Sequence, residues 1–247
     1  MYNFYMIKIL NLLKNVFYFN SSRFRLRQEN KIFADTIPSG SIVLDAGAGD
    51  QPYRYLLKHT QYESADFEKL DKPYAQSTYV CDLKILPVEN DRFDFILFNQ
   101  VMEHISDPAA VLKELNRVLK TNGKIIYTGP LFYEEHQIPY DFFRYTQFSL
   151  KKMFTEAGFE IERIDWMEGY FGTVAYKLNS MAEYLPTSPK DLGNGLFGFF
   201  LCPIMFLLKL FSKILSVFFH LLETKIKYTK RGYPKNYVGI FKKKLTT

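Results

Sequence analysis

The residues best suited to chemistry first gather in the run Leu-Asp-Ala-Gly-Ala-Gly-Asp at positions 44–50. Gly47 and Gly49 stand where an apolar run ends, and glycines there let the backbone pass close beneath a ligand because they carry no Cβ. A dinucleotide-binding fingerprint would place a third glycine at position 52, where this chain has Pro52, so tight pyrophosphate binding is disfavoured. Alone, the run is also compatible with an ordinary glycine-rich turn between a strand and a helix.

Polar side chains follow the next three predicted strands as well. Asp66 ends the second strand, where a carboxylate can accept hydrogen bonds from both ribose hydroxyls. Asp82 follows the third strand, within reach of an adenine amino group, although a solvated loop aspartate is the competing interpretation. Asn99 and Gln100 follow the fourth strand. Open α/β sheets bind ligands at the carboxyl ends of their strands, so together these positions predict a site for an adenosine-type cofactor.

The elements that must position these residues alternate between strands and helices. The apolar run at 41–45 predicts a buried strand, and further strands are predicted at 61–66, 78–81, 93–99, 124–128, 160–165 and 237–241. Helices are predicted at 23–36, 52–59, 107–120 and 149–157. Strands that alternate with helices form βαβ units, so we predict an α/β fold with a mostly parallel sheet and helices on both faces.

The order of these motifs resembles a known family. The segment VLDAGAGD, then Asp66, then the segment CDLKILPVENDRFDFILFNQVMEHISDPAAVLKELNRVLKTNGKIIYTGP are similar to class I S-adenosylmethionine-dependent methyltransferases, in particular the small-molecule branch. The resemblance covers roughly residues 42–165. It implies a Rossmann-like, seven-stranded sheet with an antiparallel last strand. It also implies a methyltransferase with S-adenosylmethionine as its cofactor.

The resemblance further implies which residues contact the cofactor. Asp45 and the two glycines would line its methionine part, Asp66 would hold the ribose, and Asp82 would flank the adenine. The full set of expected cofactor residues is Asp45, Gly47, Gly49, Asp66, Phe67, Asp82, Leu83, Asn99 and Gln100. Many members have a further glycine where this chain has Asp50-Gln51-Pro52, which we expect to alter the shape of the loop.

The segment PLFYEEHQIPYDFFRYT at 130–146 resembles a subset of these enzymes associated with cell-surface glycan or lipid-linked pathways. It follows the fifth strand, on the side expected to receive the methyl acceptor. It carries a dense set of polar and aromatic residues, namely His136, Tyr140, Asp141, Arg144 and Tyr145.

Methyl transfer makes limited demands on the protein. The methyl carbon of a sulfonium is already electrophilic, so the enzyme mainly aligns it with the acceptor atom. A hydroxyl acceptor must also lose a proton to a base. His136 is the first candidate and His104 the second, with Glu103 and Asp141 as carboxylate alternatives. The competing interpretations are that His104 shapes the site and that Asp141 pairs with Arg144 to fix the segment.

Composition and charge distribution limit the kinds of partner that we expect for this protein. The formal net charge is +6, but the basic excess lies between Lys209 and Lys244, which argues against a nucleic-acid groove across the core. The two cysteines, Cys81 and Cys202, have no metal-binding spacing and form no disulfide framework. We therefore expect a protein of the cytoplasm without a metal site.

A long apolar segment interrupts the alternation before the last strand. We predict a helical insertion at 168–232, a core at 37–167 plus 233–247, and an amphipathic helical segment at 1–36. Residues 196–222 are nearly all apolar, and Lys209, Lys213 and His220 share one helical face. This pattern favours a helix lying in a membrane interface, or a re-entrant hairpin kinked at Pro203, over a clean span. The basic residues at 225–235 suit anionic headgroups.

The leading hypothesis is a methyltransferase at the inner face of a membrane that acts on a small or lipid-linked acceptor, such as a glycan hydroxyl. A soluble enzyme with an apolar lid and a quinone-like acceptor is the first alternative. A non-catalytic scaffold subunit with the same fold is the second, and the intact glycine loop argues against it. An NAD-dependent oxidoreductase is the third, with Pro52 as the main residue against it.

Overall fold

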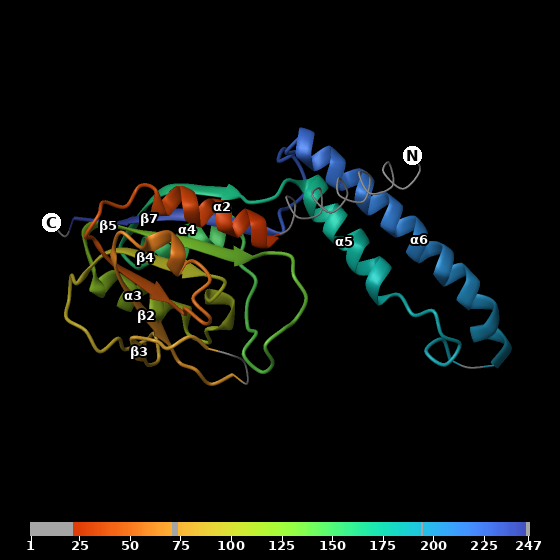
Figure 1. The fold of residues 1–247 in the computed structure, drawn as a ribbon, viewed down its shortest axis with the longest axis horizontal. Coiled ribbons are helices and arrows are strands. Elements are labelled where there is room, and N and C mark those ends of the chain that lie inside the picture. The colour runs from red at the N-terminus through yellow and green to blue at the C-terminus, as the bar shows by residue number, and fades with distance from the viewer. Residues whose placement is uncertain (1–21, 71–73, 194, 246–247) are drawn as a thin grey trace, which may run out of the picture. The chain divides into compact units, whose positions relative to one another are not determined.

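A computed structural model describes residues 22–70, 74–193 and 195–245 of the 247-residue chain (Figure 1). These residues form two compact units. The core unit comprises Leu26–Met167 and the stretch from Asn236, and the hairpin unit comprises residues 22–25 with Glu168–Lys235. The amphipathic helix expected within residues 2–19 lies outside the described residues.

The core unit is built on a seven-stranded sheet with the order β3-β2-β1-β4-β5-β7-β6. The first five strands pair in parallel, whereas β7 runs antiparallel to both of its neighbours, β5 and β6. This arrangement confirms the predicted Rossmann-like sheet with an antiparallel last strand. The strands are β1 (Ile42–Ala46), β2 (Gln61–Asp66), β3 (Tyr79–Val80), β4 (Phe93–Asn99), β5 (Leu119–Pro130), β6 (Phe159–Trp166) and β7 (Asn236–Lys243).

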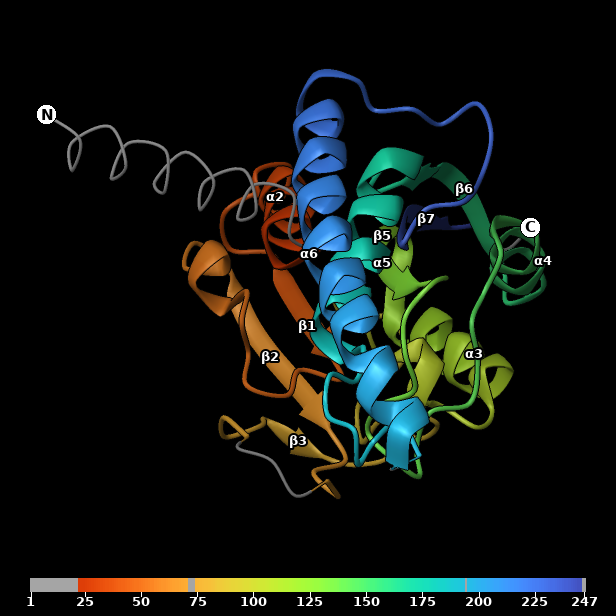
Figure 2. The same cartoon turned by 90° about the vertical axis from the view of Figure 1, so that its right-hand side faces the viewer.

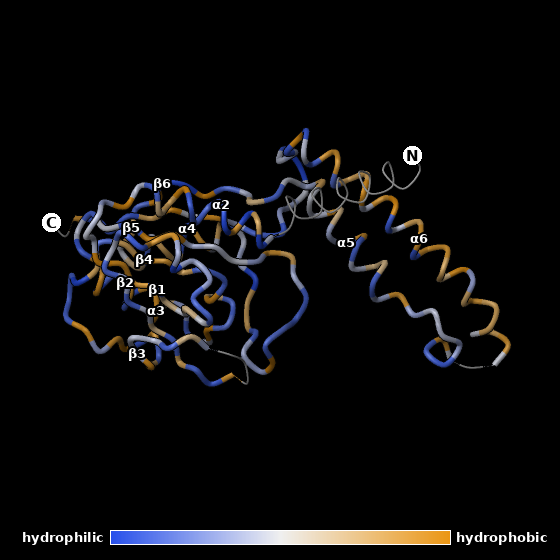
Figure 3. Tube along the Cα trace, in the orientation of Figure 1, coloured by the Kyte–Doolittle hydropathy of each residue, from blue (hydrophilic) through white to orange (hydrophobic). Residues whose placement is uncertain are grey.

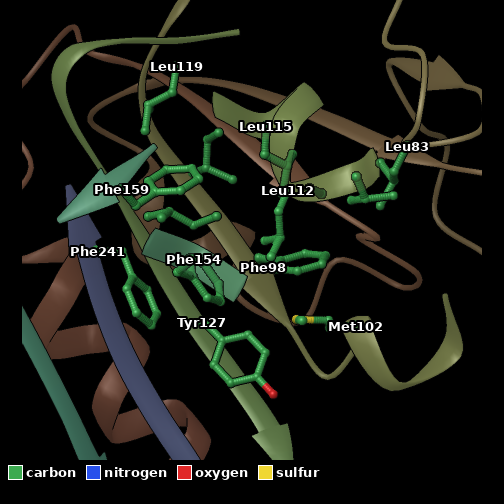
Figure 4. Packing of buried hydrophobic residues seen from close by; sticks show 14 of the residues in the cluster. Leu83, Phe98, Met102, Leu112, Leu115, Leu119, Tyr127, Phe154, Phe159 and Phe241 are labelled. Atoms are coloured by element: carbon green, nitrogen blue, oxygen red, sulfur yellow. The ribbon is translucent and has the colours of Figure 1, made fainter. Parts of the chain in front are cut away.

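Helices cover both faces of this sheet. Alternate residues of a strand point to opposite faces, so neighbours such as Ile96 and Leu97 belong to different hydrophobic clusters. One cluster packs under α3 (Pro108–Val118) and α4 (Gln147–Glu156), and the other packs under α2 (Ser22–Ala34). The first cluster is shown in Figure 4, where Phe154 stacks on Phe241 with ring centroids 3.6 Å apart.

Two predicted helix boundaries are wrong. The helix expected at 52–59 is only a short 3-10 helix, Arg54–Leu57. Pro52 disfavours the right-handed α conformation for the residue before it, and Gln51 is accordingly left-handed (φ 55°). The helix expected to end at Asn122-Gly123 ends at Val118 instead. Leu119 is already extended and begins β5, so Asn122 (φ 64°) lies within the strand.

The hairpin unit contains α5 (Tyr170–Tyr184) and α6 (Gly195–Lys225), which lie side by side (Figures 1 and 2). Helix α6 continues through Pro203, so the predicted re-entrant hairpin kinked at that proline is wrong; the turn lies between α5 and α6. Hydrophobic residues run along most of α6 (Figure 3). Within the described residues, α6 is the one helix long and apolar enough to cross a membrane, by length and composition.

Candidate active site

The glycine loop after β1 has no room for a side chain. Gly47 has a φ of +78°, and a Cβ there would come within 2.4 Å of Cγ2 of Val101, which follows β4. Gly49 also has a positive φ, of 52°. A left-handed backbone and the close approach of a second segment both require glycine at position 47. The loop therefore places bare backbone beside the end of β4.

Asp66, at the end of β2, is held in place by the same loop. Its Oδ2 accepts a hydrogen bond from the backbone N–H of Gly49 at 2.9 Å, and its Oδ1 accepts one from the N–H of Glu68 at 3.0 Å. The side chain is buried. Two backbone donors thus fix the orientation of this carboxylate before any ligand binds.

These elements enclose a cavity of about 220 Å³ at the carboxyl ends of the strands. Its wall includes residues from the ends of β1, β2 and β4 and from the segments after β3 and β5. The structure thereby brings together six of the residues predicted to contact the cofactor, namely Gly47, Asp66, Phe67, Asp82, Leu83 and Gln100. His104 lines the same cavity.

Three predicted cofactor residues do not line the cavity. Gly49 shapes the loop through Asp66. Asp45 is buried behind the loop, where it accepts a hydrogen bond from the Tyr62 hydroxyl at 2.7 Å. Burial raises the pKa of Asp45 to about 7, and the nearby carboxylates of Asp66 and Asp50 add to the increase.

Asn99, which was also predicted to close over the cofactor, does not line the cavity. Its side chain exchanges two hydrogen bonds with Asn30 of α2, at 2.8 and 3.1 Å. It also accepts one from Thr128 Oγ1 at 2.9 Å. The two hydrogen bonds with Asn30 tie α2 to the end of β4, and the one from Thr128 joins the ends of β4 and β5.

The side of the cavity expected to receive the acceptor includes residues of the 3-10 helix Met102–His104 and of the segment 130–146. The backbone N–H of Phe142 donates to the carbonyl oxygen of Glu103 at 2.8 Å, which clamps the segment onto the short helix. His104 Nδ1 lies 2.5 Å from the carbonyl oxygen of Tyr140. The ring of Tyr140 in turn packs edge-on against Phe67, with centroids 5.5 Å apart.

His136 does not line the cavity but packs behind His104, with the two ring centroids 4.7 Å apart. Asp141 does not line it either. Its carboxylate accepts two hydrogen bonds from Arg144, at 2.6 and 2.9 Å, and one from the backbone N–H of His136. These hydrogen bonds, chiefly those from Arg144, hold the pKa of Asp141 well below its usual range. Asp141 therefore fixes the conformation of the segment 130–146.

Glu103, in the short helix Met102–His104, is a buried carboxyl group without a side-chain hydrogen bond among the described residues. Burial raises the pKa of Glu103 to about 8. The nearest ring nitrogen is Nε2 of His104, 3.9 Å from Oε1.

Residues 19–164, more than half of the chain, match the family described as methyltransferase domain. The chain therefore belongs to this family, and its sheet and glycine loop are those of a class I S-adenosylmethionine-dependent methyltransferase. The predicted enzyme class and cofactor are confirmed.

The relatives differ in what their names say they methylate. The chain is 29% identical over 118 residues to a tRNA (carboxymethyluridine(34)-5-O)-methyltransferase of Arabidopsis thaliana, a match that covers 45% of this chain and 29% of that protein. It is 30% identical over 108 residues to a demethylmenaquinone methyltransferase of Chlamydia pneumoniae, covering 39% of this chain and 47% of that protein. The chain thus spans less than half the length of these relatives in the matched regions.

Solved structures share the fold at low identity. A phosphoethanolamine N-methyltransferase 2 of Haemonchus contortus, in complex with S-adenosyl-L-methionine, has a TM-score of 0.52 at 15% identity and covers 88% of this chain and 53% of its own. The [4+2]-cyclase SpnF has a TM-score of 0.55 at 15% identity, with coverages of 89% and 82%. These likenesses show the fold.

The residues at the cavity fit the cofactor. Gly47 offers backbone without a Cβ, and Asp66 offers a fixed carboxylate. Gln100 lines the cavity with a buried Nε2 that has no hydrogen-bond partner among the described residues, so a donor is available to a ligand. Such a ligand must bring an acceptor oxygen or nitrogen, and a methionine carboxylate and a ribose both do.

Sequence reasoning missed several lining residues. Val101, Lys69 and Phe142 contribute to the cavity wall. Val101 directly follows Gln100, so the end of β4 could have pointed to it. Lys69 and Phe142 lie in irregular segments, and no local pattern identifies them.

Proposed function

We propose that this methyltransferase works at the inner, cytoplasmic face of a membrane and methylates a hydroxyl of a small or lipid-linked acceptor, such as a glycan. One observation carries the membrane part of this proposal. In the hairpin unit, the buried positions of α6 are small, polar or charged, whereas most of its large apolar side chains are exposed.

The interior of the hairpin is polar. The buried residues of α6 are Gly198, Ser212, Ser216, His220 and Glu223. Ser216 Oγ donates a buried hydrogen bond to the carbonyl oxygen of Ala175 at 2.8 Å. At the exposed rim between the two helices, Lys213 Nζ donates to Asn179 Oδ1 at 2.5 Å. Lys209 Nζ donates to the carbonyl oxygen of Glu183 on the same side. The lysines predicted to share a face do so, and both reach polar groups of α5.

The outside of α6 is apolar over most of its length. Its exposed large hydrophobic residues are Leu196, Phe197, Phe199, Phe200, Ile204, Phe206, Leu207, Leu208, Leu210, Phe211, Ile214, Phe218 and Leu221. Soluble proteins rarely expose a continuous apolar surface of this size, because contact with water is unfavourable at roughly 25 cal/mol for each Å². Contact with lipid removes this cost, and we infer that the exposed side of α6 contacts lipid.

Basic residues stand where the apolar helix ends. Lys225 ends α6, and Lys227, Lys230 and Arg231 follow it. All four are exposed, a placement that suits anionic headgroups. Lys235, the last residue of the predicted basic run, is buried and lies 3.6 Å from the ring centroid of Tyr176. It therefore does not belong to the basic surface.

The chemistry of the proposal follows from the cavity. Bound S-adenosylmethionine supplies an electrophilic methyl group. The glycine loop and Asp66 hold its position, and Tyr140 and Phe142 narrow the acceptor side. Removal of the acceptor proton falls to the cluster of Glu103, His104 and His136, of which His104 lines the cavity.

Vesicle flotation tests the membrane contact. Wild-type protein is expected to float with vesicles of phosphatidylglycerol and phosphatidylcholine, and Phe206→Glu/Phe211→Glu is expected to stay at the bottom of the gradient. Phe148→Glu, at an exposed apolar position of α4, is the matched control and should float. Wild-type protein that is monodisperse without detergent and does not float would contradict the proposal.

Product analysis tests the acceptor. Membrane extracts incubated with protein and methyl-labelled S-adenosylmethionine should yield label in the lipid-extractable fraction, in a base-stable ether. A quinone-like acceptor is the second candidate, favoured by the similarity to the demethylmenaquinone methyltransferase. It would appear as label in a quinone fraction that absorbs in the ultraviolet. Label confined to water-soluble small molecules would contradict a lipid-linked acceptor.

A further inference from the structure

We propose that Glu103, His104 and His136 form a binding site for a divalent transition-metal ion, and that this ion receives the hydroxyl of the acceptor. The binding site itself is argued from the cluster alone. The role toward a hydroxyl rests on the proposed function.

The three side chains already lie close to the arrangement that a metal requires. Each offers one ligand atom, and these atoms lie within 4.8 Å of one another. Ligand atoms around a tetrahedral ion with bonds of about 2.0–2.2 Å lie roughly 3.3 Å apart. Small side-chain rotations would bring the three ligand atoms to that spacing. The short helix Met102–His104 supplies two ligands, and the clamped segment 130–146 supplies the third.

The hydrogen bonds of the two imidazoles select the nitrogen that binds. His104 Nδ1 lies 2.5 Å from the carbonyl oxygen of Tyr140, and His136 Nδ1 lies 3.1 Å from that of Glu134. A ring that donates from Nδ1 to a carbonyl carries its lone pair on Nε2. Metal-binding histidines are commonly held in this way, with the second nitrogen donating to a carbonyl or carboxylate. Asp141, itself fixed by Arg144, also lies 3.4 Å from His136 Nδ1.

Glu103 supplies the independent observation that points to a cation. Its side chain is 0% exposed, and both carboxylate oxygens lack a hydrogen-bond partner among the described residues. Arg144 is near enough to affect it, but the guanidinium is hydrogen-bonded to Asp141. Ionisation of a carboxyl group that is buried without a hydrogen bond or a bound cation is costly. A divalent ion between Glu103 and the two imidazoles removes that cost.

The donor set indicates the kind of ion. Two imidazole nitrogens and one carboxylate suit Zn²⁺, Mn²⁺ or Fe²⁺, whereas Mg²⁺ and Ca²⁺ prefer oxygen ligands. Three protein ligands leave coordination positions open for a substrate. Because His104 lines the cavity, the open positions face the acceptor side.

An ion there would acidify the acceptor hydroxyl, as zinc does for water. The O–H bond breaks and the proton passes to solvent. The oxygen then forms a bond to the methyl carbon, the bond between this carbon and the sulfonium sulfur breaks, and the sulfur keeps the electron pair. The products are a methyl ether and S-adenosylhomocysteine.

Metal binding can be measured without any acceptor. Full-length protein is stripped with a chelator, desalted and titrated with Zn²⁺ by calorimetry, and with Co²⁺ by visible absorption. We expect one equivalent to bind with a dissociation constant in the low micromolar range or tighter. Glu103→Gln, which keeps the buried shape, and His136→Ala should each weaken binding at least about tenfold, in keeping with the loss of a ligand. His59→Ala, outside the cluster, should bind as wild type does.

Each outcome has a definite meaning. S-adenosylhomocysteine binding by the variants reports that they are folded. Unchanged metal affinity in both Glu103→Gln and His136→Ala, or no stoichiometric binding by wild type, would overturn the site. Full activity of the stripped protein would show instead that His104 acts as a metal-free base. Metal binding without methylation of any membrane acceptor would leave the site intact and contradict the proposed function.

Discussion

Asp66 Oδ2 accepts the backbone N–H of Gly49 at 2.9 Å, so the carboxylate at the end of β2 and the glycine loop after β1 form one unit. This hydrogen bond crosses between two strands that are neighbours in the sheet. It means that the carboxylate both shapes the loop and lines the cavity.

Asp66→Ala is therefore expected to abolish measurable binding of S-adenosylhomocysteine. Hydrogen bonds to a charged group contribute about 1.5–3 kcal/mol each, and about 1.4 kcal/mol corresponds to a tenfold change in affinity. Loss of several such bonds predicts a decrease of at least about 100-fold by calorimetry. Asp82→Ala is the control, because that carboxylate is more than half exposed and pairs with Lys84; it should cost less than about tenfold.

Gly47→Ala should be more harmful than the same change at another left-handed glycine. Gly40 has a φ of +82°, and a Cβ at that position would meet no atom within 4 Å, so Gly40→Ala incurs only the backbone strain of about 1–2 kcal/mol. At Gly47 the methyl also overlaps Val101, which adds about 1–3 kcal/mol. Thermal denaturation should rank the variants in this order. Adding Val101→Ala to Gly47→Ala should recover part of the loss, and no recovery would contradict the steric explanation.

Asp45 predicts how the stability of the core unit depends on pH. Its folded-state pKa is raised from 3.8 to about 7, so the folded state binds the proton more tightly than the unfolded chain does. The stabilisation that the folded state gains from the raised pKa of Asp45 is complete below about pH 4, and it is lost as the pH rises to about 7. Asp45→Asn removes this dependence, so its melting temperature should rise relative to wild type between pH 4 and pH 7. The full effect is on the order of 4 kcal/mol. A constant difference across this range would contradict the assignment.

Glu223 is expected to hold the hairpin unit together. Its carboxylate accepts the backbone N–H groups of Gly169 and Gly172, at 2.7 and 3.0 Å, and so caps the start of α5 from α6. Glu223→Ala leaves two buried donors without this acceptor, which costs about 1–3 kcal/mol each. Amide hydrogen exchange at residues 169–173 should accelerate, and proteolysis between 168 and 235 should become faster. Thr224→Ala, at the exposed neighbouring position, should change neither.

The strands that form the base of the site were predictable from the sequence. The bounds of β2 and β4 match the predicted strands. For β4 the reason is that a strand covered on both faces of a sheet is a largely apolar segment that ends in polar residues. The positions of Asp66 and Gln100 at the cavity follow from those strand ends. The helical pattern at 52–59 was misleading, because it gave no sign of the left-handed conformation of Gln51 directly before it.

The remaining features depended on contacts between residues far apart in the chain. Asn99 was expected at the cofactor but is hydrogen-bonded to Asn30, and no sequence pattern connects the two positions. Periodicity placed Lys209 and Lys213 on one face of a helix, but it could not say whether α5 or solvent covers that face.

Local runs of residue types were enough to predict the alternation of strands and helices, the glycine loop and the kind of cofactor. Which polar groups are buried, and what they contact, depends on the packing of segments that are far apart in the chain. In the folded chain Asp141 is hydrogen-bonded to Arg144, Glu103 is buried beside two imidazoles, and the apolar side of α6 is exposed. Burial and pairing are properties of the packed chain, so they are absent from any local sequence pattern.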